Sequence, residues 1–526
     1  MSELIERLRA NLRAAGIPAI DDDFAGIVEM GFLSRVADFA RIVDAAPADT
    51  LPDYLDAGNL PAPTLATAPA GPPAAAPEDT IAGIAVQIRS RAVSPVELTA
   101  QALAQIAARD GELNAFQVVL ADAARAEAQA AEKALAAGTY HGPLHGVPLA
   151  VKDLLDLAGT RTRAGSSFHG PLNASQDATA VAKLRTAGAV IVGKTRLSEF
   201  AYSPGSNNAH YGATANPHDL SRDTGGSSSG SAAATAAGMA FAALGTDTGC
   251  SIRIPAAFCG LVGLKPTWGR TSLAGGVTLS WSLDHLGPIA RSVADAALLL
   301  EVLAGPDLRD GRTLRPAPAF IAGDLTAGVQ GLRIAIISAD GSGAPLAAEA
   351  QRAAVGKAAA ALQSAGAEVS ELEIPELDQL RVLGSAILGM EAAAFHLPTL
   401  RTRLDDYGSF MRRRVLANFV YQPVDFIRAQ QARAVLRRRM LERCAGIDLL
   451  IGPIHPGPVP ARGVPANNGL AIPFNNLGWP ALTMPAVKGE DGLPIAVQIA
   501  GKPWQEQTVL RAAYVVEQAL GRMPLV

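Results

Sequence analysis

Two glycine-rich turns carry the serines of this sequence that are best placed for chemistry. The first turn, Asp223 to Ser231, reads Asp-Thr-Gly-Gly-Ser-Ser-Ser-Gly-Ser, and the second, Gly245 to Pro255, reads Gly-Thr-Asp-Thr-Gly-Cys-Ser-Ile-Arg-Ile-Pro. Glycine beside serine allows backbone N–H groups and hydroxyls to come close to another group. The pattern fits a phosphate site, a site that attacks a carbonyl, or a tight corner in a core.

Three familiar motifs match these turns poorly. A phosphate-binding loop needs Gly-Lys-Ser/Thr, which the first turn, 225–231, lacks. A Gly-x-Ser-x-Gly nucleophile elbow would use Ser228, but it needs a preceding buried strand, and residues 216–223 predict a loop. Asp-Thr-Gly occurs twice, at Asp223 and Asp247, yet the paired aspartates of an acid protease come from two separate lobes.

A base for a serine nucleophile is available upstream. Val147 to Val151 predicts a short buried strand, and Lys152 follows at its end. A lysine in that position is more often a solvent-exposed residue that ends the strand. If Lys152 is buried instead, burial would lower its pKa by disfavouring the charged form. A general base working near neutral pH needs a pKa of roughly 7–8. On this second interpretation, serines of the two turns would serve as proton relay and nucleophile.

The motifs resemble the amidase signature family. Its hallmark is Gly-Gly-Ser-Ser-Gly/Ser-Gly followed by Gly-Thr-Asp-x-Gly-Gly-Ser-Ile-Arg-x-Pro, which falls here on 225–230 and 245–255. Further similarity lies at 146–153, 260–267 and 282–288. The resemblance is strong over about 90–300, weaker over 330–375 and 445–526, and absent from 1–75.

This resemblance implies a Ser-Ser-Lys triad. The family's catalytic lysine falls on Lys152, its bridging serine, which follows a cis peptide bond, on Ser227, and its nucleophile on Ser251. The family's spacing of 24 between the two serines (251 − 227) holds here and excludes Ser228 as the bridging residue. The resemblance also implies an oxyanion hole made of four backbone N–H groups, those of Thr248, Gly249, Cys250 and Ser251.

Two features of the second turn carry their own expectations. Asp247 and Arg253 flank the nucleophile, and we expect them to form a structural ion pair that shapes the turn. Cys250 departs from the family's usual glycine. If that position required positive φ, cysteine would be strained there, and its side chain would narrow the oxyanion pocket. The simpler expectation is a tolerated small residue.

The order of helices and strands predicts an α/β protein. Ser94-Pro-Val-Glu97 is a capping box that begins a helix. Residues 178–194 predict a helix and a strand, 332–374 a βαβ unit, and 376–445 helices whose basic runs, 412–414 and 437–439, face solvent. The Ala/Gly-rich run 229–244 is too short to span a membrane and is interpreted as a buried helix.

The resemblance implies the amidase signature fold, a mixed β-sheet covered by helices on both faces. We expect three segments along the chain: a small all-helical appendage at 1–60, a Pro/Ala-rich linker at 61–78, and the catalytic domain at 79–526. We expect the appendage to be a packing or dimerisation element, giving a homodimer through the N-terminal helices, with a lid over a substrate site as the alternative.

Composition favours small-molecule chemistry. The net charge of −4 gives no argument for nucleic acid or an anionic membrane as a partner. The three cysteines, Cys250, Cys259 and Cys444, form neither a disulfide framework nor a zinc site, and the first residues lack a hydrophobic signal core. We therefore expect a cytoplasmic enzyme without cofactor or metal.

The expected activity is hydrolysis of an amide to a carboxylic acid and ammonia or an amine through an acyl-enzyme, with aryl amides or carbamates among the substrates. The alternative is the glutaminase subunit of a tRNA-dependent amidotransferase. The missing basic patch and the helical extension favour the free-standing amidase. The resemblance also implies that certain loops line the substrate pocket, and residues in or beside them indicate a substrate with an apolar or aryl acyl group. These residues are Tyr202, Asn207, Phe258, Trp281, Ile454 and Trp479.

Overall fold

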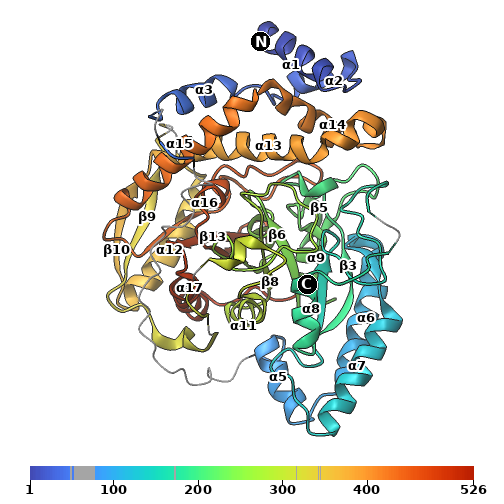
Figure 1. Cartoon of the computed structure of the whole chain (residues 1–526). Helices are drawn as coiled ribbons and strands as arrows, with labels where there is room; N and C mark the ends of the chain where they lie inside the picture. The colour runs from blue at the N-terminus through green and yellow to red at the C-terminus, as the bar shows by residue number, and fades with distance from the viewer. Residues whose placement is uncertain are drawn as a thin grey trace.

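An eleven-stranded mixed sheet forms the centre of the protein (Figure 1). The computed structural model describes residues 1–47, 50–52, 77–170, 173–315, 317–320, 322–341, 343 and 345–526. The strand order is β1-β3-β2-β6-β8-β7-β12-β13-β11-β9-β10. The bounds are β1 Phe116–Val119, β2 Pro148–Lys152, β3 Val190–Thr195, β6 Ala242–Asp247, β7 Val262–Lys265, β8 His285–Ala290, β9 Arg333–Ala339, β10 Glu368–Glu373, β11 Leu449–Pro453, β12 Ala481–Lys488 and β13 Pro494–Gly501.

Pairing within the sheet is parallel at two places and antiparallel elsewhere. Strand β2 runs parallel to both β3 and β6, and β9 runs parallel to both β10 and β11. The remaining neighbours are antiparallel. The expected βαβ unit is β9, helix α12 (Glu349–Ser364) and β10. A short separate ribbon pairs β4 (Ala215–Asn216) with β5 (Asp219–Asp223), just before the first serine turn.

Helices cover both faces of the sheet, as the fold class predicts. Alternate residues of β2 point to opposite faces, since Leu149 and Val151 join one apolar cluster and Ala150 joins another. The first face is covered by α5 (Ile81–Arg89), α8 (Thr179–Thr186), α11 (Val293–Leu303), α12 and α17 (Glu506–Leu520). The second face is covered by α6 (Pro95–Leu113), α7 (Ala121–Ala136), α9 (Ser229–Ala236) and α10 (Arg253–Phe258). Helix α6 begins at the expected capping box.

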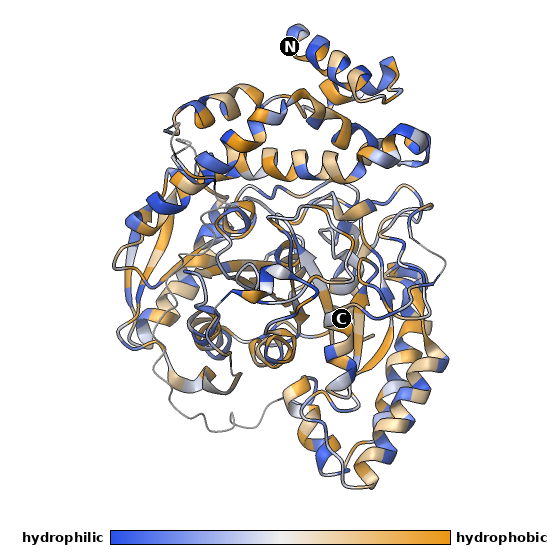
Figure 2. Ribbon diagram, viewed as in Figure 1, coloured by the Kyte–Doolittle hydropathy of each residue, from blue (hydrophilic) through white to orange (hydrophobic). Residues whose placement is uncertain are grey.

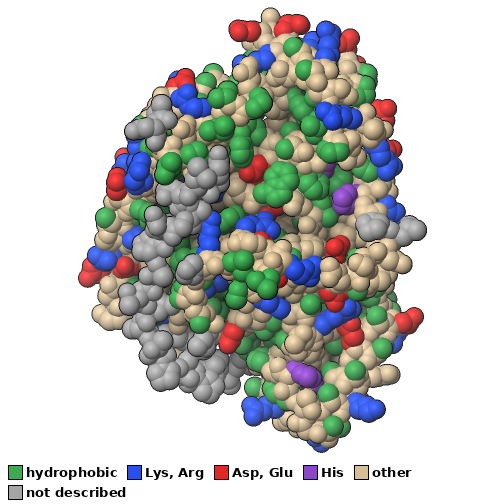
Figure 3. All heavy atoms as spheres, in the orientation of Figure 1, with side chains coloured by type: hydrophobic (Ala, Val, Ile, Leu, Met, Phe, Trp, Pro, Cys, Tyr) green, Lys and Arg blue, Asp and Glu red, His purple; other side chains and the backbone are tan. Residues whose placement is uncertain are grey.

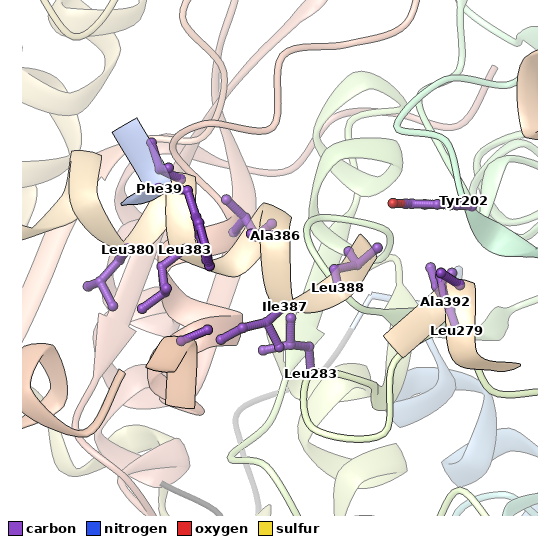
Figure 4. Packing of buried hydrophobic residues seen from close by; sticks show 14 of the residues in the cluster. Phe39, Tyr202, Leu279, Leu283, Leu380, Leu383, Ala386, Ile387, Leu388 and Ala392 are labelled. Carbon is purple, nitrogen blue, oxygen red and sulfur yellow. The ribbon is translucent and has the colours of Figure 1, made fainter. Parts of the chain in front are cut away.

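A layer of helices lies over the second face, towards the top of Figure 1. It consists of α13 (Glu376–Arg403), α14 (Ser409–Leu416), the 3₁₀ turn η5 (Ala417–Val420), α15 (Pro423–Arg443) and α16 (Ile472–Leu477). Helix α13 is long and apolar enough to cross a membrane, but 67% of its apolar window is buried within the protein. It is a core helix, with Phe39 on one side and Leu283 beside Ile387 on the other (Figure 4).

The N-terminal helices expected from the sequence are α1 (Ser2–Ala14), α2 (Asp21–Glu29) and α3 (Val36–Asp44). Their apolar faces turn towards the layer of α13 to α15 (Figure 2), and Leu8, Leu12 and Ile27 are fully buried there. The appendage therefore packs part of its apolar surface against its own chain, while Ile20, Val28 and Met30 stay exposed, and dimerisation through it stays a prediction. The expected linker lies outside the described residues, except for 77 and 78.

Three sequence expectations are wrong. Residues 216–223 are not a loop, because 219–223 forms β5, but only the last residue of this strand is buried, so it is not the buried strand that a nucleophile elbow needs. The run 229–244 is not one helix, because α9 ends at Ala236 and the run continues into β6. The basic run 412–414 does not face solvent. Arg412 pairs with the buried Asp23 of α2 at 2.8 Å, and the guanidinium of Arg414 lies 4.2 Å from the ring centre of Tyr202. Arg412 therefore joins the appendage to α14, and Arg414 joins α14 to the loop that carries Tyr202.

Candidate active site

Lys152 is fully buried at the carboxyl end of β2, so the interpretation of this residue as a solvent-exposed strand end is wrong. Because β2 and β6 are parallel neighbours, Thr246, near the end of β6, lies beside Lys152. Lys152 Nζ lies 2.7 Å from Ser227 Oγ and 2.8 Å from Thr246 Oγ1. Burial lowers the pKa of Lys152 to about 7, against the opposing effect of Asp247 and Asp284. A substantial fraction of this amine is thus neutral near pH 7, as a general base requires.

Ser227 lies in the turn between β5 and α9, and the Gly226–Ser227 peptide bond is cis. Gly225 has φ of +76°, and a Cβ at Gly226 would meet the carbonyl oxygen of Gly205 at 2.1 Å. The glycines are therefore required because the turn presses on another loop of the protein. Ser228 has a different setting, since its hydroxyl lies 3.3 Å from the carbonyl oxygen of Thr246.

Ser251 lies in the turn between β6 and α10 and is only 5% exposed. The two serine turns are in direct contact, because the Ser228 N–H donates to the Ser251 carbonyl oxygen at 3.2 Å. Among the residues that the structure describes, no hydrogen bond joins the hydroxyls of Ser227 and Ser251. Such contacts are often long in ligand-free enzymes and tighten when substrate binds.

The backbone N–H groups predicted to form the oxyanion hole lie in the same turn. Within the described ranges, the N–H groups of 248–251 donate to no other protein atom. Consecutive backbone N–H groups that lack an internal acceptor are suited to hold an anion. The turn is fixed from outside by Thr248, whose hydroxyl donates to Asp284 at 2.6 Å. Burial raises the pKa of Asp284 to about 6.

The expected ion pair between Asp247 and Arg253 is confirmed. Their side chains are both fully buried and meet at 3.0 Å. Burial alone would raise the pKa of Asp247, but Arg253, Asn475 and Lys265 together outweigh this effect and hold that pKa well below its usual range. Arg253 also donates to Asn475 and Gln498, at 2.6 Å each. The pair therefore clamps the nucleophile turn to α16 and β13.

Cys250 is accommodated without backbone strain, because its φ is not positive. Its thiol lies 3.7 Å from the Gly226 carbonyl oxygen and joins an apolar cluster with Ile254 and Phe258. Burial raises the pKa of the thiol to about 12, so it stays protonated. The simpler expectation, a tolerated small residue, fits this environment.

The other residues considered from the sequence are spread over several places. The aspartate of the first Asp-Thr-Gly has a separate role, since Asp223 accepts hydrogen bonds from Ser206 and Gly225. The six loop residues do not form one pocket. Trp281 lines one pocket, Phe258 and Ile454 line another, and Trp479 is buried in the core. Asn207 donates to the Gly463 carbonyl oxygen at 2.7 Å.

Sequence reasoning missed Thr246 and Asp284 as neighbours of the predicted triad. Thr246 precedes Asp247 in the hallmark motif, and Asp284 lies in the 282–288 motif. Neither motif indicates which residue these side chains contact. The signal that could have found Thr246 is its position near the end of a strand parallel to β2. Asp284 has no comparable signal, because the loop that returns it to Thr248 follows no periodic pattern.

In this site a deeply buried lysine is hydrogen-bonded to a serine, beside a turn whose N–H groups have no acceptor in the described part of the chain. Serine hydrolases that use a lysine as base have this arrangement. The model of the family described as Amidase matches residues 97–510. The chain belongs to the amidase signature family, whose members are hydrolases acting on C–N bonds.

Curated relatives and solved structures agree with this assignment. The chain is 39% identical to a glutamyl-tRNA(Gln) amidotransferase subunit of Prochlorococcus marinus (strain MIT 9313), over 83% of this chain and 96% of that one. It is also 39% identical to an amidase of Pseudomonas putida, over 84% and 96%. A solved structure, described as a vestigial protein complex that reveals the origins of an s-triazine catabolic enzyme, has a TM-score of 0.80 at 38% identity, covering 85% and 100%.

Proposed function

We propose that the protein hydrolyses amides with Ser251 as nucleophile, Ser227 as proton relay and Lys152 as base. The observation that carries this proposal is the contact of a fully buried lysine, its pKa lowered by burial to about 7, with Ser227 Oγ at 2.7 Å. Burial keeps a substantial fraction of the amine neutral near pH 7, and its hydrogen bond to a hydroxyl gives a proton a route to it.

In this proposal Ser251 Oγ attacks the amide carbonyl carbon while its proton passes through Ser227 to Lys152 Nζ. The carbonyl oxygen becomes an oxyanion, and the N–H groups of the 248–251 turn hold it. The same proton then moves to the leaving nitrogen as the C–N bond breaks, which gives ammonia or an amine and an acyl-Ser251. Water cleaves this ester by the reverse route and restores the serine.

The substrate divides the proposal into two candidates. The names of the relatives favour the glutaminase subunit of an amidotransferase, which the sequence placed second, over the free-standing amidase, which it placed first. The N-terminal helices lie outside the matched range 97–510 and favour neither. Both candidates share the triad chemistry, and they differ in the acyl group and in the need for a partner protein.

A substrate panel tests the proposal. The purified chain is assayed with acetamide, benzamide, acetanilide, a phenyl carbamate and glutamine, alone and with any protein that co-purifies from its own host. Hydrolysis of several amides by the chain alone supports the free-standing amidase. Turnover of glutamine only, and only with a co-purified protein, supports the glutaminase subunit. Failure on every compound in both preparations contradicts amide hydrolysis.

A further inference from the structure

A pocket of about 790 Å³ lies at the junction of the N-terminal appendage and the catalytic domain. This volume is in the range of small-molecule sites, roughly 300–1,000 Å³. Its walls come from α1, the 279–284 loop, α13, η5 and α15, and they are mostly apolar. The residues that the argument uses are Asn11, Ala14, Trp281, Phe419, Tyr421 and Phe426. In the space-filling view, hydrophobic side chains gather around a hollow below the N-terminal helices (Figure 3).

Helix α1 forms part of this wall and is held there by specific contacts. Asn11 donates through Nδ2 to the Phe419 carbonyl oxygen at 2.6 Å, and Arg401 donates to the Ala15 carbonyl oxygen at 2.7 Å. Helix α3 supports the same wall, because Phe39 packs on Tyr421 with ring centres 4.8 Å apart. The appendage is therefore fixed against the pocket by side chains from two of its helices.

A chain of contacts joins the pocket to the nucleophile turn. Glu391, a pocket residue on α13, accepts hydrogen bonds from the Ser280 hydroxyl and from the Ser282 N–H at 3.1 Å. The N–H of Ser280 donates to Asp284 at 3.1 Å, and Asp284 accepts from the hydroxyl of Thr248. The loop that carries Trp281 into the pocket is thus the loop that fixes the predicted oxyanion turn.

A second set of contacts starts from η5. Asn418, another pocket residue, donates to the Tyr202 hydroxyl at 3.4 Å, and the Tyr202 ring lies under the Arg414 guanidinium of α14. These contacts fix η5 against the loop that carries Tyr202. The link between the pocket and the nucleophile turn is therefore the hydrogen-bond chain through Glu391, Ser280 and Asp284.

From this arrangement we propose that the pocket binds a bulky aromatic group of the substrate amide and that α1 acts as a specificity element. The aromatic side chains of Trp281, Phe419, Tyr421 and Phe426 suit an aryl group, which they can contact face to edge. Helix α1 lies outside the matched family range, so this wall is an addition to the catalytic domain. The inference rests on the proposed amide hydrolysis and names its substrate class.

The test fills the pocket from the appendage. Ala14 and Ala10 are both exposed alanines of α1, but only Ala14 lines the pocket. Ala14→Trp projects a large side chain into the cavity, and Ala10→Trp is the matched control. Steady-state kinetics are measured for acetamide and for 4-phenylbutanamide, in the full chain.

For Ala14→Trp we expect kcat/KM for 4-phenylbutanamide to fall by about tenfold or more, since apolar contacts in a pocket give discrimination of roughly 10–200-fold. Its value for acetamide should stay within about twofold, as should both values for Ala10→Trp. An equal loss for both substrates, or no loss for either, overturns the proposal.

Binding separates this inference from the proposed function. Isothermal titration calorimetry of 4-phenylbutanamide with the Ser251→Ala chain, with and without Ala14→Trp, needs no turnover. Binding that is weakened by Ala14→Trp and not by Ala10→Trp supports the pocket, even if the wild-type chain hydrolyses no amide. Binding that is unchanged by Ala14→Trp, or undetectable in the Ser251→Ala chain, contradicts the pocket, even if hydrolysis is observed.

Discussion

Lys152 Nζ lies 2.7 Å from Ser227 Oγ, although 75 residues separate them in the sequence. Two other lysines are equally buried in the described part of the chain, but their partners differ. Lys194 donates to the Thr162 hydroxyl at 2.9 Å but also pairs with the carboxylate of Asp153 at 2.7 Å, which favours its charged form. Lys265 donates to the carbonyl oxygens of Pro266 and Trp479. Among the described residues, Lys152 donates to two hydroxyls and to no carboxylate, and this setting distinguishes a candidate base from two structural lysines.

The pH dependence of kcat/KM should follow the neutral fraction of Lys152. Burial lowers the pKa of this lysine to about 7, and only its neutral form accepts a proton. Activity should therefore fall about tenfold for each pH unit below 7 and level off above it. Rates from about pH 5 to about pH 9 give the profile.

Asp284 also titrates in this range, because burial raises its pKa to about 6. Asp284→Asn removes this second group and should keep the fall that begins near pH 7. A flat profile across the range in both proteins would show that Lys152 is not the base.

Replacing Lys152 should affect catalysis, whereas replacing Lys265 should affect stability. For Lys152→Ala we expect kcat to fall by about 10²–10⁴-fold, the usual contribution of a general base. Lys265→Met is the matched control, because Lys265 is just as buried but donates only to carbonyl oxygens. Its kcat per folded molecule should stay within about tenfold. A larger loss of kcat in Lys265→Met than in Lys152→Ala would show that Lys152 is not the base.

Thiol reagents should leave the enzyme active, even though Cys250 is next to the predicted nucleophile. The thiol is buried and its pKa is raised to about 12, and the thiolate is the reactive form. Iodoacetamide at pH 8 should therefore give no loss of activity and no alkylation of Cys250 in the folded protein. Rapid inactivation that Cys250→Ala prevents would indicate an accessible, reactive thiol.

Breaking the clamp at Asp247 should destabilise the protein. Arg253→Met leaves a buried carboxylate without its partner, which typically costs about 3–5 kcal/mol. The solvent-accessible pair Arg333 and Asp448 offers a control, and Arg333→Met should cost at most about 1 kcal/mol. Urea unfolding of both variants measures the difference. Equal midpoints for the two would show that the buried pair does not hold the turn.

The sequence predicted the sheet, the helices around it and the residues of the site because these follow motifs and periodic patterns. It did not predict where α9 ends, since the run 229–244 consists of small apolar residues that suit a helix and a strand alike. It also placed the arginines at 412–414 in solvent. Their partners, Asp23 and Tyr202, lie far away in the sequence, and no local sequence pattern predicts such an ion pair or stacked ring.

The candidate site shows the same limit. The residue types and the spacing of 24 identified Lys152, Ser227 and Ser251 as a set only through a resemblance. Their contacts depend on β2 and β6 ending side by side, which is a property of the whole sheet. Thr246 and Asp284 were missed for that reason, because each acts through a partner that the sheet or a returning loop supplies.

The identity of the nucleophile is the central claim, and covalent labelling tests it most directly. The wild-type chain is treated with a serine-directed phosphonate, digested and examined by mass spectrometry, beside Ser251→Ala and Ser228→Ala. We predict one adduct, on Ser251, with loss of activity, no adduct and no activity in a folded Ser251→Ala protein, and normal labelling of Ser228→Ala. An adduct on Ser228 or Cys250, or wild-type activity in Ser251→Ala, would contradict the account.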